Sequence, residues 1–111
     1  MPLVSIQATQ ETPTEVIAEL SRIAAETIGK PERYVMVSAT KSDLMMGGVE
    51  GNAAFVEVKS IGGLNHDVCE KLSANICNLL KAKLQIPPDR IYLNFTEVPA
   101  SQWGVNGSLF G

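Results

Sequence analysis

The chain lacks a basic stripe, a signal peptide and a long apolar run, and each absence excludes a class of function. Nine Lys and Arg stand against 12 Asp and Glu, and the net charge of −3 offers no positive field to a phosphate backbone. We therefore expect no nucleic-acid partner. No stretch approaches the ~20 apolar residues that span a bilayer, and the N-terminal residues have no positive region or apolar core. We predict a cytoplasmic protein without a membrane partner, or one secreted without a signal peptide.

Cysteine and histidine are also scarce. Cys69 and Cys77 would lie roughly 12 Å apart on one helix, beyond the reach of a disulfide, so we expect two reduced thiols. His66 is the only histidine and there is no CxxC pair, so we predict no metal site. Because the sequence shows no Ser, Cys or Asp partner set for His66, we interpret it as a surface residue.

The length of 111 residues fits one domain over residues 1–111, and 45% hydrophobic with 19% charged residues is ordinary for a globular protein. A single core of this size is only marginally stable. Burial of further apolar area between subunits is therefore plausible.

The first part of the chain predicts a β-α-β unit. Residues 3–6 alternate as a short strand. We expect Thr12 to cap a helix whose first residue is Pro13, because this order is typical of helix starts. Apolar residues then recur at helical spacing over 16–28, and a strand rich in β-formers follows at 34–40.

The same order recurs in the second part. A strand is predicted at 53–61, a helix capped by Asn65 follows, and residues 91–95 form the next strand. The two helix exits match: Pro31-Glu32-Arg33-Tyr34 and Pro88-Asp89-Arg90-Ile91 are both Pro, acid, Arg and a β-former.

Two such units indicate pseudo-repeats at about 1–50 and 51–111. They favour an α/β fold with a four-stranded mixed sheet and both helices on one face. The right-handed crossover rule makes the two strands of each unit parallel. The apolar tail, 103–110, has no obvious place on this sheet, so we expect short edge strands that pair with a neighbouring subunit.

Pro2 is the first candidate for chemistry. Removal of Met1 would leave a secondary amine, and burial or a nearby cation would lower its pKa from about 8 towards neutrality, where a general base is most efficient. Proline at this position also occurs in proteins where it has no catalytic role.

Other candidates are equally ambiguous taken singly. Lys30 follows a helix end, where it either complements the helix C-terminus or binds a substrate carboxylate. Asn94 is a polar residue in an apolar strand and shares a face with Tyr92, so it needs a partner or a ligand. The glycines after Ser60 and Ile61 allow a ligand to approach the backbone. Glu97 is expected to be exposed.

Together these residues resemble the macrophage migration inhibitory factor and D-dopachrome tautomerase family over essentially the whole chain. The matching segments are Met1-Pro2, Gly29-Lys30-Pro31, Leu44-Met45-Met46-Gly47-Gly48, Ser60-Ile61-Gly62, Pro88-Asp89-Arg90-Ile91-Tyr92-Leu93-Asn94 and Asn106-Gly107-Ser108-Leu109-Phe110.

The resemblance implies a homotrimer with a site at each subunit interface and a cofactor-free isomerase acting on aromatic α-keto acids such as phenylpyruvate and on dopachrome analogues. It implies that Pro2 is the base and that Lys30 and the backbone of Ile61 bind the carboxylate. Tyr92 and Asn94 would come from the adjacent subunit, and Tyr34 and Phe110 would line the apolar end.

Two departures from the family pattern stand out. The CxxC of the mammalian cytokines is replaced by Ala53-Ala54-Phe55-Val56, so thiol–disulfide activity is expected to be absent. The order Trp103-Gly104-Val105 exchanges Trp and Val, which bears on substrate preference. The alternative function is a cytokine-like secreted protein that binds a cell-surface receptor and keeps a vestigial pocket. A trimeric scaffold without a site is the third interpretation, opposed by the coincidence of Pro2, Lys30 and Asn94.

Overall fold

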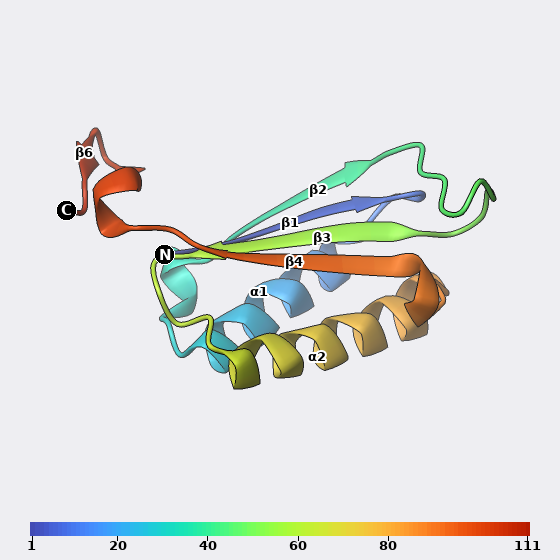
Figure 1. Ribbon diagram of the computed structural model, residues 1–111, viewed down its shortest axis with the longest axis horizontal. Helices are drawn as coiled ribbons and strands as arrows, with labels where there is room; N and C mark the ends of the chain where they lie inside the picture. Colours follow the sequence, from blue (N-terminus) through green and yellow to red (C-terminus); the bar gives the residue numbers. More distant parts are fainter.

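The computed structural model describes residues 1–111 as a four-stranded sheet with two helices packed on one face (Figure 1). The helices are α1 (Thr14–Ile28) and α2 (His66–Leu84). The sheet strands are β1 (Pro2–Ala8), β2 (Met36–Lys41), β3 (Ala54–Ser60) and β4 (Ile91–Glu97). This arrangement confirms the predicted α/β class.

The strand order is β2-β1-β3-β4. β1 pairs with β2 in parallel and β3 with β4 in parallel, as the crossover rule predicted, and β1 and β3 join the two units in antiparallel. The start of β1 therefore lies at the same end of the sheet as the ends of β3 and β4. In this register Pro2 faces Ser60, and Ser60 faces Glu97.

The core lies between the sheet and the helices. Alternate residues of β1 and β3 are buried against the helices because side chains of a strand alternate between faces. From α2, one residue per turn enters the core: Leu72, Ile76, Leu80 and Leu84. Neither helix combines the length and the hydrophobicity needed to cross a membrane.

The other face of the sheet carries no covering layer within the chain (Figure 1). Two large side chains on it are well exposed, Met36 at 66% and Tyr92 at 64%. These two side chains stand on the two edge strands of the sheet, Met36 on β2 and Tyr92 on β4.

Two local predictions were wrong. Thr12 does not cap α1: Pro13 takes the N-cap position with extended backbone (ψ 153°), and the buried Thr12 hydroxyl has no hydrogen-bond partner. Proline suits both positions because its fixed φ, here −61°, is compatible with each. Tyr34 does not begin a strand, because Glu32–Tyr34 forms a 3₁₀ turn, η1, and β2 begins at Met36.

The second exit forms the equivalent turn, η2 (Pro88–Arg90), directly before β4. The repeated Pro-acid-Arg motif therefore encodes a turn in both units. The two arginines have different contacts. The Arg33 guanidinium lies 4.6 Å from the Tyr34 ring centroid, whereas Arg90 donates to the carbonyl oxygens of Val49 and Asn52, both at 2.9 Å.

The tail forms a unit of its own beyond η3 (Ala100–Gln102). β5 (Gly104–Val105) and β6 (Ser108–Leu109) pair in antiparallel, separately from the main sheet. Figure 1 shows this hairpin projecting from the end of the sheet at which the N-terminus lies. The short strands that we expected are present, but within one chain they pair only with each other.

Candidate functional site

Pro2, the first candidate for chemistry, lies at the end of the sheet where β1 begins. Pro2 is fully buried, and its ring faces the helices together with Ser60, which is 0% exposed. The carbonyl of Ser60 accepts a hydrogen bond of 2.8 Å from the amide of Val98. The first residue of β1 is thus held between the helix layer and a fixed neighbouring strand.

Lys30 reaches this end because of the way α1 terminates. Gly29 takes the left-handed conformation (φ 80°), and the amides of Gly29 and Lys30 both donate to the carbonyl of Ala25, at 2.9 and 3.1 Å. Lys30 then lies beside the loop after β3, where a Cβ added to Gly63 would stand 3.8 Å from the Lys30 Cε. None of the ion pairs includes Lys30, so its charge is free to act on a ligand or on the nearby N-terminus.

The pKa of the Met1 amine reflects the burial and the positive charge at the end of the sheet where β1 begins. Burial is the larger cause that lowers the pKa of the Met1 amine below its ordinary value of 8.0, and the positive charge of Lys30 is the second. With Met1 in place the Pro2 nitrogen is an amide without basicity, so the Met1 amine stands in for the Pro2 amine one residue away. The same two causes would act on a free amine at Pro2.

The loop between β3 and α2 completes the cluster. Ile61 is followed by Gly62 and Gly63, whose φ values of 69° and 80° lie in the region that favours glycine. Pro2, Lys30 and the backbone at Ile61 therefore lie at the same end of the sheet, and all three are residues that the family resemblance implied for the site.

Tyr92 and Asn94 are not part of this cluster within one chain. In the register of β3 and β4 they pair with Phe55 and Glu57, on the uncovered face of the sheet. Tyr92 is five residues from Glu97, roughly 17 Å along the strand, and β4 is two strands from β1, about 10 Å. One chain cannot bring Tyr92 and Pro2 into the same pocket, so that arrangement requires a second copy.

Tyr34 and Phe110 lie in segments that leave the sheet at the Pro2 end. Tyr34 is 42% exposed and its hydroxyl accepts from the Arg33 guanidinium at 3.1 Å. Phe110 is 46% exposed, and its amide donates to the carbonyl of Trp103 across the base of the hairpin. Both aromatic side chains are therefore partly open to solvent within one chain.

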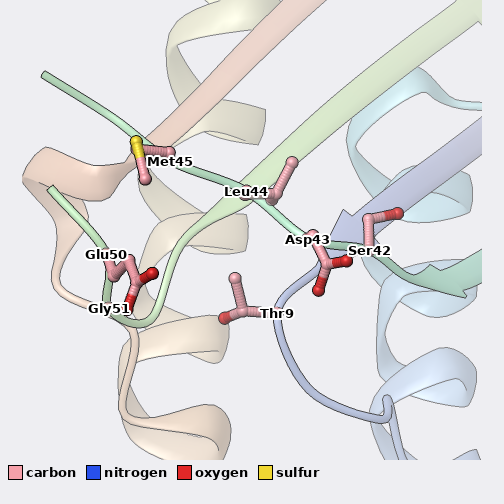
Figure 2. A pocket seen from close by; sticks show the side chains of 7 residues that line it. All are labelled: Thr9, Ser42, Asp43, Leu44, Met45, Glu50 and Gly51. Atoms are coloured by element: carbon pink, nitrogen blue, oxygen red, sulfur yellow. The ribbon is translucent and has the colours of Figure 1, made fainter. Parts of the chain in front are cut away.

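A separate hollow of about 450 Å³ lies at the opposite end of the sheet. Figure 2 shows its lining: Thr9, Ser42, Asp43, Leu44, Met45, Glu50 and Gly51. Thr9 follows the last residue of β1, roughly 23 Å along the strand from Pro2. Because two carboxylates and no cation line it, this hollow is unsuited to an anionic substrate.

The cysteines lie on α2, Cys69 near its start, where the thiol donates to the carbonyl of Leu64, and Cys77 about two turns further along the helix. Both thiols are free, and burial raises the pKa of each; the charge of Glu97 raises that of Cys69 further. Raised pKa values keep thiols protonated and weakly nucleophilic. No group of three or more His, Cys, Asp and Glu side chains is arranged to hold a metal.

Sequence reasoning missed two residues near the site. Glu97 is exposed, as expected, but its carboxylate accepts a hydrogen bond of 3.3 Å from the amide of Leu64. Ser60 carries a buried hydroxyl without a partner on the same face as Pro2. Strand parity could have placed both on the helix-facing side, since Glu97 is an odd number of positions from Asn94.

Comparison with known proteins gives one consistent result. The family model described as macrophage migration inhibitory factor matches residues 1–111. Among curated relatives, macrophage migration inhibitory factor from Meriones unguiculatus is 34% identical over 88% of this chain and 86% of its own. The homolog from Brugia malayi is 34% identical over 86% of this chain and 84% of its own.

Solved structures agree with the sequence relatives. The macrophage migration inhibitory factor homologue from Prochlorococcus marinus is 41% identical with a TM-score of 0.92, covering 98% of this chain and 99% of its own. The similar protein from Entamoeba histolytica is 35% identical with a TM-score of 0.93, covering 98% of each chain.

Proposed function

Because the chain belongs to the macrophage migration inhibitory factor family, with the fold of the tautomerase superfamily, we propose that it is a cofactor-free keto–enol tautomerase with Pro2 as its base. Its substrates are aromatic α-keto acids of the phenylpyruvate type and dopachrome analogues. One observation carries the proposal: Pro2 is buried at the start of β1, at the end of the sheet that Lys30 reaches, where burial and then the charge of Lys30 lower the pKa of the adjacent Met1 amine.

The chemistry follows from that environment. The neutral amine of Pro2 takes a proton from the carbon α to the ketone, and the C–H electron pair forms the C=C bond. The carbonyl oxygen becomes an enolate and receives a proton from the Pro2 ammonium, directly or through water, which gives the enol and restores the neutral amine. Lys30 and the backbone of Ile61 hold the substrate carboxylate, which keeps the reacting carbon within reach of the base.

The assembly that we propose is a homotrimer in which the site is completed by a neighbour. Tyr92 and Asn94 lie on the uncovered face of the sheet, too far from Pro2 of their own chain. From an adjacent subunit their polar groups would donate to the developing oxyanion or orient the ring of the substrate. Tyr34 and Phe110 supply the aromatic lining.

The test compares wild type with Pro2→Gly in the enolisation of phenylpyruvate, followed by the ultraviolet absorbance of the enol trapped as its borate complex. We expect a loss of at least 100-fold in kcat/KM, in the range that general-base catalysis contributes. Circular dichroism of both proteins controls for folding. A wild type that turns over at the background rate would overturn the proposed enzyme.

The second candidate is a cytokine-like binding protein, favoured by the names of the curated relatives. In that case the pocket is vestigial and a cell-surface receptor is the partner. The same assay separates the two, because a protein that only binds shows no turnover above background.

A further inference from the structure

Leu64 is held through both of its backbone groups by side chains from other parts of the chain. Its amide donates to Glu97 Oε2 at 3.3 Å, and its carbonyl accepts from the Cys69 thiol at 3.6 Å. Its side chain is buried in the core. Leu64 is therefore a fixed point at the start of α2.

The other end of the loop is equally fixed. Ser60 ends β3, is 0% exposed, and its carbonyl accepts from the amide of Val98 at 2.8 Å. Only three residues separate Ser60 from Leu64. Two of them, Gly62 and Gly63, have the conformational freedom of glycine, so the position of Ile61 depends on how its two anchors are held.

Glu97 is the only long-range side-chain anchor of this loop that carries a charge. It stands opposite Ser60 in the β3–β4 register, and a Cβ on Gly62 would lie 4.0 Å from its Oε2 atom. Lys30 lies along the same loop, beside Gly63. Glu97 accepts from the Leu64 amide through Oε2 and forms no ion pair with Lys30, so the Lys30 ammonium is available for a substrate carboxylate.

We infer that Glu97 is a positioning residue: by accepting from the Leu64 amide it holds the Ile61–Gly63 loop in the place where the Ile61 backbone binds the substrate carboxylate. This inference rests on the proposed function, because it assigns a role in binding the α-keto acid. Glu97 itself does not contact the substrate.

The experiment uses three variants of the full chain. Glu97→Gln keeps an acceptor oxygen, Glu97→Met keeps the length without an acceptor, and Glu97→Ala removes both. For phenylpyruvate we expect Glu97→Met and Glu97→Ala to raise KM roughly 3- to 10-fold with kcat nearly unchanged, and Glu97→Gln to restore KM. The methyl ester of phenylpyruvate should respond much less, because it lacks the carboxylate. Glu11→Ala, at an exposed position outside the site, is the matched control.

Amide exchange of Leu64 gives a readout that does not depend on activity. It should be faster in Glu97→Met than in wild type and Glu97→Gln. If the wild type is inactive but shows this exchange pattern, the hydrogen bond from Leu64 to Glu97 is supported. The proposed tautomerase function is then overturned, and with it the role of Glu97 in substrate binding. An active wild type with equal KM in all variants would overturn the inference, as would an equal loss in Glu97→Gln and Glu97→Met. The Gln and Met pair serves if Glu97→Ala does not fold.

Discussion

Pro2 and Ser60 face each other across the antiparallel ladder of β1 and β3, and both are fully buried on the helix-facing side. The Ser60 hydroxyl has no hydrogen-bond partner there. A buried polar group left unpaired costs roughly 1–3 kcal/mol, so natural proteins seldom keep one without a reason. It lies beside the residue whose nitrogen we propose as the base.

The first prediction concerns the N-terminus. Mass spectrometry of the purified protein should show Met1 missing. Placing one Ala ahead of Pro2 should abolish turnover while leaving the circular dichroism spectrum unchanged, because the Pro2 nitrogen then becomes an amide without basicity. Full activity of the extended protein would contradict the role of Pro2.

The second prediction concerns pH. A base works in its neutral form, so kcat/KM should rise with pH through an apparent pKa below the ordinary value of about 8. Lys30→Ala removes a positive charge that disfavours the ammonium, so this pKa should increase and the profile should move to higher pH. Because burial is the larger cause at the N-terminal amine, the pKa should remain below that of a free amine.

Lys30→Ala should also weaken substrate binding. A charge-assisted hydrogen bond contributes roughly 1.5–3 kcal/mol, which corresponds to a 10- to 100-fold loss in kcat/KM for phenylpyruvate. Lys71→Ala, at an exposed position on α2, is the matched control and should change neither quantity. If kcat/KM is the same in Lys30→Ala and Lys71→Ala, Lys30 does not bind the substrate and only complements the C-terminus of α1.

The third prediction concerns assembly. Sedimentation should give about three times the chain mass of 11.9 kDa. Met36→Lys places a charge on the uncovered face of the sheet and should lower the fraction of trimer at micromolar concentration, whereas Ala74→Lys on the exposed side of α2 should not. A wild-type monomer at micromolar concentration would refute the shared site.

The fourth prediction concerns the loop beside Lys30. Gly63→Ala should lower the free energy of unfolding by more than the roughly 1–2 kcal/mol expected for a side chain in the left-handed region, because its Cβ would stand 3.0 Å from Ile28 Cγ2. Gly47→Ala has a similar φ of 61° and no neighbour within 4 Å, so it measures the backbone cost alone. If urea titrations show that both variants lose the same free energy of unfolding, the contact between the new Cβ and Ile28 costs no stability.

The sequence predicted the fold well where one physical cause dominates. The alternation over 3–6 and the helical spacing of apolar residues over 16–28 follow directly from burial of one face of each element. The sequence-based prediction was wrong where the same residue type is compatible with two local conformations. Tyr34 favours strands, yet it ends a 3₁₀ turn, and Pro13 fits a helix's first position as well as its N-cap.

The candidate site was predictable only in part, for a similar reason. The family resemblance grouped Pro2, Lys30 and Ile61, and the structure places all three at one end of the sheet. Strand parity indicates the face of Glu97 but not its partner, because the hydrogen bond joins it to Leu64, 33 residues away in the sequence. The separation of Tyr92 from Pro2 depends on which strands are neighbours, which periodicity does not specify.

The two β-α-β units run in opposite directions, so the two ends of the sheet have the same arrangement of elements. At each end the first strand of one unit begins, and the segment that follows the helix of that unit lies beside it. The ends are nevertheless chemically unequal. Pro87 takes the place in the second exit that Lys30 takes in the first, and Ala54, which begins β3, has an ordinary peptide nitrogen where Pro2 would offer an amine. In the proposed trimer only one end of this repeated framework carries a reactive amine. The other end supplies Tyr92 to the site of a neighbouring subunit, and the acidic hollow of Figure 2 lies at that same end.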